Sequence, residues 1–179
     1  MRRRFNFRIA SGIALIVAGA LLASFPYFTD VRYTVAQSSM AASATGQTMP
    51  GKAVARLIVP AIALDAFVME GTTAEVLNQA PGHYPATPLP GEQGNSAIAG
   101  HRTMYGHPFR RLDELKAGEE IVTYTNATRA RYKVVSVTVV APTSVGVAGP
   151  TADDRITLTT CNPVGSAAQR LVVVGKRVE

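Results

Sequence analysis

The sequence is poor in cysteine and in charged residues, and it contains no tryptophan. Its single cysteine excludes a disulfide within the chain and a metal site built from several thiolates. Charged residues make up 17% of the 179 residues and hydrophobic residues 47%, a balance that excludes a chain disordered throughout. The length is that of one globular domain with an additional segment.

Positive charge is concentrated at the N-terminus. Arg2, Arg3, Arg4 and Arg8 supply four of the formal net charge of +6, which leaves +2 for the rest of the chain. The rest of the chain also lacks the alternation of aromatic and basic residues that is typical of nucleic-acid binding. We therefore expect no nucleic-acid partner.

Residues 9–28 form an uncharged run of twenty residues, IASGIALIVAGALLASFPYF. As a helix this run spans about 30 Å, which is the thickness of a bilayer core. The arginines that precede it predict that residues 1–8 remain in the cytoplasm and that everything after Asp30 lies outside. We interpret residues 9–28 as a transmembrane signal-anchor helix.

Two other interpretations of this run stay open. A cleaved signal peptide has a similar composition, and Ala18-Gly19-Ala20 resembles a small-residue cleavage site. The apolar run continues past those residues, which favours an uncleaved anchor. The second alternative is a helix buried in a protein core, which the absence of a polar face disfavours.

The rest of the chain divides into a linker and a domain. Residues 29–52 are rich in Ser, Thr, Ala and Gly without hydrophobic periodicity, so we expect a flexible extracytoplasmic linker. Residues 53–179 are expected to form the folded domain. Short apolar stretches between turn residues predict its strands at 55–60, 62–68, 96–101, 119–125, 129–141, 154–161 and 169–178.

Little helix is expected in this domain. Thr72 and Glu75 have the spacing of a capping box before a short helix through about Gln79. Residues 108–115 could form one or two helical turns, whereas the Pro- and Gly-rich stretch 81–95 is expected to be irregular. Several short strands with brief helices predict a mainly β fold, either a single barrel or a sandwich.

Cys161 is the first candidate for chemistry. It ends the alternating stretch Ile156-Thr157-Leu158-Thr159-Thr160 and is followed by Asn162-Pro163. A free cysteine is usually a small buried hydrophobic residue. A strand end beside a Gly- and Ser-containing loop is also where a side chain meets a substrate, so a nucleophilic thiol is the competing interpretation.

A reactive thiol needs a base or a cation nearby, and the sequence offers several. His101 follows the small-residue stretch Ala97–Gly100, whereas His83 and His107 lie in segments rich in proline and glycine. For each histidine a structural role is the alternative. Arg170 begins the apolar stretch 171–174 and could either lie at a barrel rim or stabilise an oxyanion. No acidic residue or cysteine stands at metal-ligand spacing near the histidines, so no metal is expected.

These residues carry a resemblance to sortases, the cell-wall transpeptidases of Gram-positive bacteria. The segment Leu158-Thr159-Thr160-Cys161, with Arg170 nine residues later, resembles the family's cysteine signature. Ala97–Arg102 resembles its histidine motif. The longer strings GHYPATPLPG, IAGHRTMYGHPF and TLTTCNP are similar to actinobacterial class E sortases.

The resemblance implies a sortase catalytic domain over residues 53–179, folded as an eight-stranded barrel behind an N-terminal transmembrane helix. Cys161 would be the nucleophile, His101 the general acid and base, and Arg170 the group that stabilises the oxyanion and the substrate. Thr160 and Tyr105 would contribute to substrate binding, with Tyr105 shaping the pocket for the second residue of the sorting motif. A packed loop aromatic is the alternative for Tyr105.

The implied reaction cleaves an LPXTG- or LAXTG-type signal between Thr and Gly and transfers the acyl group to an amine of a cell-wall precursor. Its partners would be surface proteins that carry the signal, a peptidoglycan precursor of the lipid II kind, and the membrane. No cofactor is implied, and Asp113, Glu114, Glu119 and Glu120 are expected to form a solvated surface rather than a calcium site. The enzyme would be a single-pass membrane protein whose catalytic domain faces the cell wall.

The sequence departs from the family pattern at one position near the cysteine. Many class E-like members carry histidine after the cysteine where this chain has Asn162. The alternatives to an anchoring sortase are a pilin-linking sortase, a cysteine peptidase that hydrolyses without transfer, and a surface binding domain in which Cys161 is buried and inert.

Overall fold

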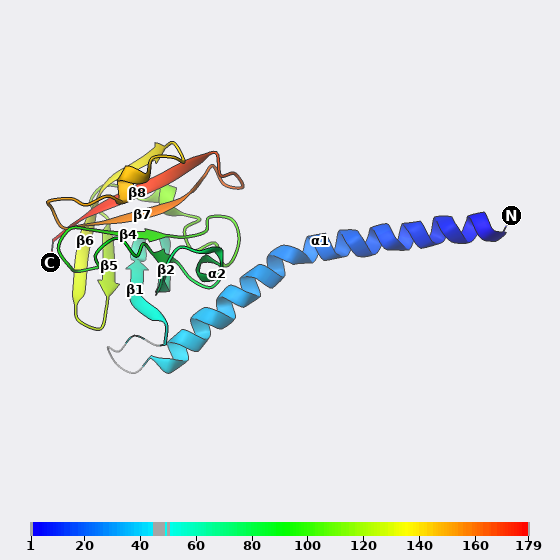
Figure 1. The fold of residues 1–179 in the computed structure, drawn as a ribbon, viewed down its shortest axis with the longest axis horizontal. Helices are drawn as coiled ribbons and strands as arrows, with labels where there is room; N and C mark the ends of the chain where they lie inside the picture. The colour runs from blue at the N-terminus through cyan, green and yellow to red at the C-terminus, as the bar shows by residue number, and fades with distance from the viewer. Residues whose placement is uncertain (1, 45–48, 50, 179) are drawn as a thin grey trace.

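The computed structural model describes residues 2–44, 49 and 51–178. In these residues a β-barrel forms the body of the molecule, and one long helix, α1 (Arg2–Ser43), extends away from it (Figure 1). The predicted mainly β fold, a barrel preceded by a long apolar helix, is confirmed.

Eight strands close the barrel in the order β1-β2-β3-β4-β7-β8-β6-β5. Their bounds are β1 (Ala53–Val59), β2 (Leu64–Glu70), β3 (Gly82–His83), β4 (Asn95–Ala99), β5 (Glu120–Tyr124), β6 (Arg129–Val140), β7 (Arg155–Asn162) and β8 (Gln169–Arg177). The pairing of β1 with β5 closes the sheet. Such closure removes most of the free sheet edge among the described strands, which is how small β folds avoid unwanted strand pairing.

Two strand pairs in this barrel are parallel, β2 with β3 and β4 with β7. The other six pairs are antiparallel. Because parallel strands end at the same edge of a sheet, the β4–β7 pair brings the segments of His101 and Cys161 to one edge of the barrel.

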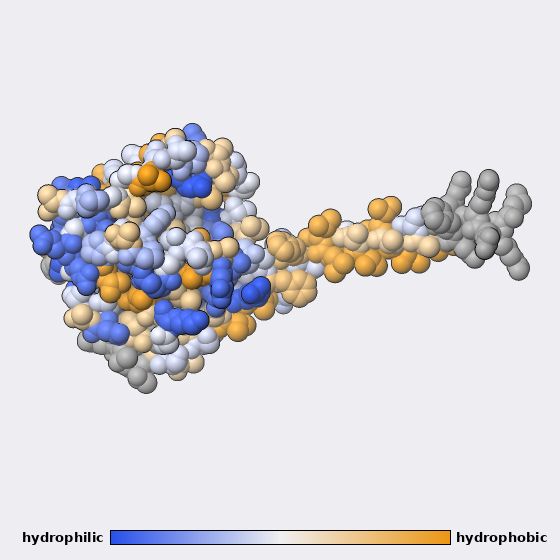
Figure 2. Space-filling view, viewed as in Figure 1, coloured by the Kyte–Doolittle hydropathy of each residue, from blue (hydrophilic) through white to orange (hydrophobic). Residues whose placement is uncertain are grey.

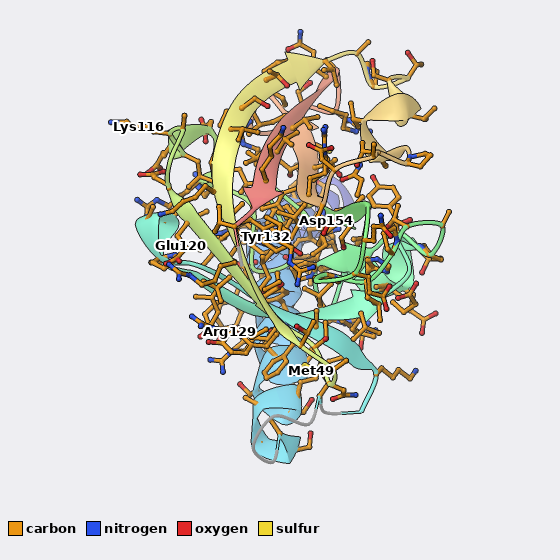
Figure 3. All side chains as sticks on the ribbon, turned by 90° about the vertical axis from the view of Figure 1, so that its left-hand side faces the viewer. Met49, Lys116, Glu120, Arg129, Tyr132 and Asp154 are labelled. Atoms are coloured by element: carbon orange, nitrogen blue, oxygen red, sulfur yellow. The ribbon has the colours of Figure 1, made fainter. Side chains whose placement is uncertain are left out.

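Alternate side chains along the strands point inward and fill the barrel interior. In β1 every second side chain is buried, as expected for a strand with one face toward the core. Tyr132 from β6 is almost fully buried, and its hydroxyl accepts a hydrogen bond from the Gly91 N–H (Figure 3). The largest fully buried apolar side chains of this core are Phe109, Leu57, Ile98, Leu112, Ile121, Ile156 and Leu158.

Four short helical segments connect the strands: α2 (Ala74–Leu77), η1 (Pro60–Ile62), η2 (Leu112–Glu114) and η3 (Val145–Ala148). The predicted cap of α2 is wrong by one residue, because the N-cap is Thr73, whose backbone is extended. Its Oγ1 accepts a hydrogen bond from the Val76 N–H at 3.4 Å. Within residues 108–115, η2 is the helical element.

Two strand ends also differ from the sequence prediction. The stretch 81–95, expected to be irregular, contains the two-residue strand β3, because Gly82 and His83 pair with both β2 and β4. The strand predicted to end at His101 ends at Ala99 instead. His101 therefore lies in the loop that follows β4.

The flexible linker predicted over residues 29–52 is wrong for its first part, since α1 continues through Ser43. One face of this part packs on the barrel, and Met40 is buried with Phe67 and Met69. Tertiary burial can stabilise a helix whose composition alone does not predict one. Residues 45–48 and 50 of the predicted linker lie outside the described residues.

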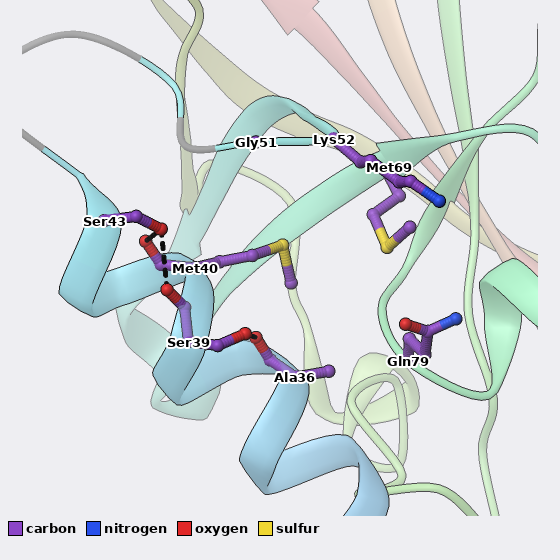
Figure 4. A pocket seen from close by; sticks show the side chains of 8 residues that line it. All are labelled: Ala36, Ser39, Met40, Ser43, Gly51, Lys52, Met69 and Gln79. Atoms are coloured by element: carbon purple, nitrogen blue, oxygen red, sulfur yellow. Dashed lines mark hydrogen bonds between the residues drawn. The ribbon is translucent and has the colours of Figure 1, made fainter.

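Gln37 adds a polar contact between α1 and the sheet. Its Oε1 accepts the Phe67 N–H at 2.8 Å, and its Nε2 donates to the Phe67 carbonyl at 3.1 Å, as a neighbouring strand would. Beside this contact, Ala36, Met40, Met69 and Gln79 line an open pocket between helix and barrel (Figure 4).

Residues 9–28 of α1 project from the barrel and present an apolar surface (Figure 2). By length and composition, residues 9–43 of α1 form a helix that could cross a membrane. Its most apolar part is not buried against any of the described residues. The alternative of a buried core helix is therefore wrong.

Side chains inside the barrel should contribute more to the free energy of unfolding than side chains on its outer surface. We expect Leu57→Ala to lower the free energy of unfolding by about 2–5 kcal/mol, because it removes a fully buried side chain from the barrel interior. Val139→Ala, at an exposed position of β6, is the control and should change the stability by less than about 0.5 kcal/mol. Urea unfolding of the full chain in detergent micelles measures both, and equal losses would contradict this description of the core.

Candidate active site

The parallel pair β4–β7 brings the histidine and cysteine segments to one edge of the barrel. Ala99 pairs with Thr159 at the end of β4, and the Gly100 N–H donates to the Thr159 carbonyl at 3.1 Å. The Thr160 hydroxyl then donates to the Gly100 carbonyl at 2.7 Å. His101 and Cys161 therefore follow directly after the last contacts between the two strands.

Gly100 permits this close approach. A Cβ at this position would lie 2.7 Å from the Phe109 ring, so a larger residue would displace that ring. Phe109 is fully buried, and its N–H donates to the His101 carbonyl at 3.1 Å. The glycine before His101 thus allows the backbone of the histidine segment to lie directly on the core.

The antiparallel pair β7–β8 brings Arg170 to the cysteine. Cys161 and Arg170 are direct cross-strand partners at the end of the two strands. Cys161 is a free cysteine and is half-buried. The Arg170 guanidinium donates to the carbonyls of Ala167 and Gln169, both at 3.0 Å, and so lies at the loop end of the strand pair.

The His101 imidazole is partly removed from water, and one of its ring nitrogens is unpaired among the described residues. Its Nε2 is buried and has no hydrogen-bond partner among the described residues. Burial lowers the pKa of His101, because removal from water disfavours the charged imidazolium. A neutral imidazole can accept a proton when a thiol attacks, which is the property that a general base needs.

Tyr105 covers His101 from the following loop. The two ring centroids are 5.1 Å apart with an interplanar angle of 30°. The structure therefore brings Tyr105 to the candidate site. The Thr160 side chain, by contrast, is buried and engaged with Gly100, so Thr160 can meet a substrate through its backbone and not through its hydroxyl.

Arg102 is a residue of this site that the sequence analysis missed. It is only 3% exposed, and its guanidinium donates to Asn162 Oδ1 at 2.6 Å and pairs with Asp113 at 2.7 Å. It thereby connects the residue after His101 to the residue after Cys161. The available signal was its place directly after the histidine. Asn162 supplies the acceptor.

The other two histidines lie in different settings. His83 is buried, its Nδ1 lies 2.9 Å from Glu70 Oε2 and its Nε2 lies 3.0 Å from the Pro88 carbonyl oxygen. These contacts fit a structural role in the proline-rich loop. His107 lies in the loop after His101, beyond Tyr105.

Acidic side chains near η2 and β5 pair with arginines. The pairs are Arg102–Asp113, Arg111–Glu114 and Arg131–Glu120. Among the described residues, no group of three or more His, Cys, Asp or Glu side chains could hold a metal ion.

Comparison with known proteins identifies the family. The sortase domain model matches residues 57–178. The chain is 32% identical to sortase SrtE1 of Streptomyces coelicolor over 95% of its own length and 57% of that protein. Among solved structures, sortase E1 of Streptomyces coelicolor with a tripeptide in the active site superposes with a TM-score of 0.66 at 33% identity, covering 75% of this chain and 92% of that one.

A Clostridium perfringens sortase D5 transpeptidase superposes with a TM-score of 0.70 at 25% identity, covering 83% of this chain and 99% of that one. The chain therefore belongs to the sortase family, and the resemblance to class E members is confirmed. It spans slightly more than half the length of SrtE1.

The buried setting of His101 predicts its titration. The imidazole should titrate with a midpoint below the ordinary value of about 6.5, because burial disfavours its charged form. NMR spectra of the histidine-labelled full chain in micelles, recorded across a pH series, measure this midpoint. The His101→Gln variant assigns the signal by its loss. A midpoint at or above the ordinary value would contradict the burial described here.

Proposed function

We propose that this sortase is a membrane-anchored cysteine transpeptidase that cleaves an LPXTG- or LAXTG-type sorting signal between Thr and Gly. The observation that carries the proposal is the meeting of three groups at one barrel edge. Cys161 is the cross-strand partner of Arg170, and His101 follows the strand that pairs with the cysteine strand. Membership in the sortase family supports the same chemistry.

The first step forms a thioester. Cys161 Sγ attacks the carbonyl carbon of the signal's threonine while His101 Nε2 takes the thiol proton. Negative charge develops on the carbonyl oxygen, where the Arg170 guanidinium and a backbone N–H near Thr160 or Cys161 stabilise it. The Thr–Gly C–N bond then breaks, and His101 gives its proton to the departing glycine amine.

The second step transfers the acyl group. An amine of a cell-wall precursor attacks the thioester carbonyl carbon, and His101 takes a proton from that amine. The C–S bond breaks, and the cysteine sulfur recovers its proton from His101. The surface protein is then joined to the precursor through a new amide bond, and the enzyme returns to its starting state without a cofactor.

The proposed location follows from α1. Residues 9–28 span the membrane, residues 1–8 stay in the cytoplasm, and residues 53–179 form the catalytic domain outside, facing the cell wall. The apolar, projecting first half of α1 supports this arrangement. The positive-inside rule supports the orientation, since four arginines precede the run. The partners in this account are the signal-bearing surface proteins and a lipid II-like precursor.

The proposal predicts a covalent adduct on Cys161. We expect the full chain in micelles to gain the mass of the acyl fragment when incubated with an LPXTG or LAXTG peptide. Cys161→Ala and His101→Ala should abolish the adduct. Arg170→Ala should slow its formation by about 100-fold or more, because one oxyanion donor is lost. Arg129→Ala, an exposed arginine on β6, is the matched control and should react like wild type.

Addition of an amine acceptor separates the remaining alternatives. Conversion of the adduct to a ligated product supports transfer, whereas release of free acid at the same rate with and without acceptor indicates a hydrolytic peptidase. Preference for a glycine amine over a lysine side-chain amine favours wall anchoring, and the reverse preference favours pilin linkage. A folded chain that gives neither adduct nor cleavage with either peptide would contradict the proposed function.

Tyr105 is proposed to shape the pocket for the second residue of the signal. Its ring lies against His101, so a truncated side chain enlarges the space beside the reacting carbonyl. We expect Tyr105→Ala to change the ratio of kcat/KM values for LPXTG and LAXTG peptides, measured in competition by mass spectrometry. Tyr124→Ala on β5 is the control aromatic. An unchanged ratio for Tyr105→Ala would remove Tyr105 from the specificity pocket.

A further inference from the structure

The second half of α1 contacts the barrel along one stripe of side chains. Asp30, Tyr33, Gln37 and Met40 lie three or four residues apart, which places them on one helix face, and Thr29, four residues before Tyr33, borders the same face. Thr29 and Met40 are buried, whereas Arg32 and Val35, on the remaining surface of the helix, are exposed. This part of α1 is therefore a packed element of the catalytic domain.

The N-terminal end of this stripe contacts the loop that follows His101, the candidate catalytic histidine. Asp30 Oδ1 accepts a hydrogen bond from the Gly106 N–H at 2.8 Å. The Tyr33 ring lies directly on Gly106, where any Cβ would overlap ring atoms. The contact thus combines one charge-assisted hydrogen bond with an aromatic ring packed on bare backbone.

The contacted loop has an unusual backbone. Tyr105, Gly106 and His107 have φ angles of 53°, 70° and 38°, a left-handed conformation that two of these three residue types adopt rarely. Such a conformation persists where surrounding contacts fix it. Within the loop, the His107 N–H donates to the Met104 carbonyl at 3.0 Å. From outside the loop, Asp30 and Tyr33 hold its central residue.

This loop places Tyr105 on His101, with ring centroids 5.1 Å apart. We propose that Asp30 and Tyr33 of the anchor helix are positioning residues for His101, acting through Gly106 and the Tyr105 ring. The inference rests on the role proposed above for His101. It makes the membrane anchor part of the active-site architecture, rather than a tether alone.

Asp30 also lies close to the end of the proposed membrane span. Asp30 stands two residues after the proposed membrane span of residues 9–28. The histidine loop therefore packs on the first turn of helix outside the bilayer. The same contact that orders the loop holds the site close to the membrane surface, where a lipid-linked acceptor would be found.

The experiment uses the full chain in micelles and two pairs of substitutions. Asp30→Ala removes the hydrogen-bond acceptor and Asp30→Asn keeps one. Tyr33→Ala removes the ring and Tyr33→Phe keeps it. Val35→Ala is the control on the exposed helix face. We expect both alanine variants to slow acyl-enzyme formation by about 10- to 100-fold, mainly in kcat, because the reacting groups are misplaced. The conservative variants and the control should react near the wild-type rate.

Alkylation of Cys161 by iodoacetamide distinguishes positioning from loss of fold. At alkaline pH a thiol ionises without help from a general base, so alkylation there does not depend on His101 and the alanine variants should react at the wild-type rate. Loss of alkylation together with a lowered melting temperature would indicate a merely structural contact and overturn the proposal. Asp30→Asn reacting as slowly as Asp30→Ala, or Asp30→Ala reacting like wild type, would also overturn it.

An activity-independent readout separates this inference from the proposed function. The Tyr105 ring should shift the His101 Cε1–H signal in NMR spectra of the full chain. Asp30→Ala and Tyr33→Ala should move that signal toward the position of an unstacked histidine, and Val35→Ala should not. An unmoved signal contradicts the positioning role. A wild-type chain that shows the shifted signal but forms no acyl-enzyme contradicts the proposed function alone.

Discussion

The parallel pairing of β4 with β7 is the interaction on which the candidate site depends. Parallel strands end at the same sheet edge, so the residues after Ala99 and after Thr159 emerge side by side. Antiparallel pairing of β7 with β8 then brings Arg170 opposite Cys161. Strand direction and register thus bring three residues, separated by up to 69 positions in the chain, to one edge of the barrel. The buried Arg102, bonded to Asn162, adds a polar connection between the same two chain segments.

The sequence predicted much of this arrangement because its signals are local. Short apolar stretches between turn residues indicated seven of the eight strands. The reason for the small residues before His101 became visible only in the structure, where Gly100 lies on the Phe109 ring. The candidate residues Cys161, His101 and Arg170 came from a family resemblance carried by short segments. Spacing alone left each of them with a structural alternative. The two-residue strand β3 escaped prediction because its pairing partners, not its own residues, make it a strand.

Features that depend on contacts distant in sequence could not be predicted in this way. The composition of residues 29–43 indicates a linker, yet burial of Met40 and the bonds of Gln37 to Phe67 hold it as a helix on the barrel. Tyr33 fits over Gly106 only because that residue lacks a side chain, a match between positions 73 residues apart. The burial of Arg102 depends on Asn162 and Asp113 as partners, and these contacts join segments distant in the sequence.

The pairing of β4 with β7 places Cys161 and His101 after neighbouring strand ends. We expect the thiol and the imidazole to lie close together there, and one measurement without a substrate tests this. Cys161 can be converted to its methyl disulfide with a ¹³C-labelled methylthiolating reagent, and the full chain then examined by NMR in micelles. We expect nuclear Overhauser effects between the labelled methyl group and the His101 ring protons, and none to the ring of His83. A methyl group that shows effects to core residues but none to His101, in a chain with its barrel intact, would contradict this arrangement of the site.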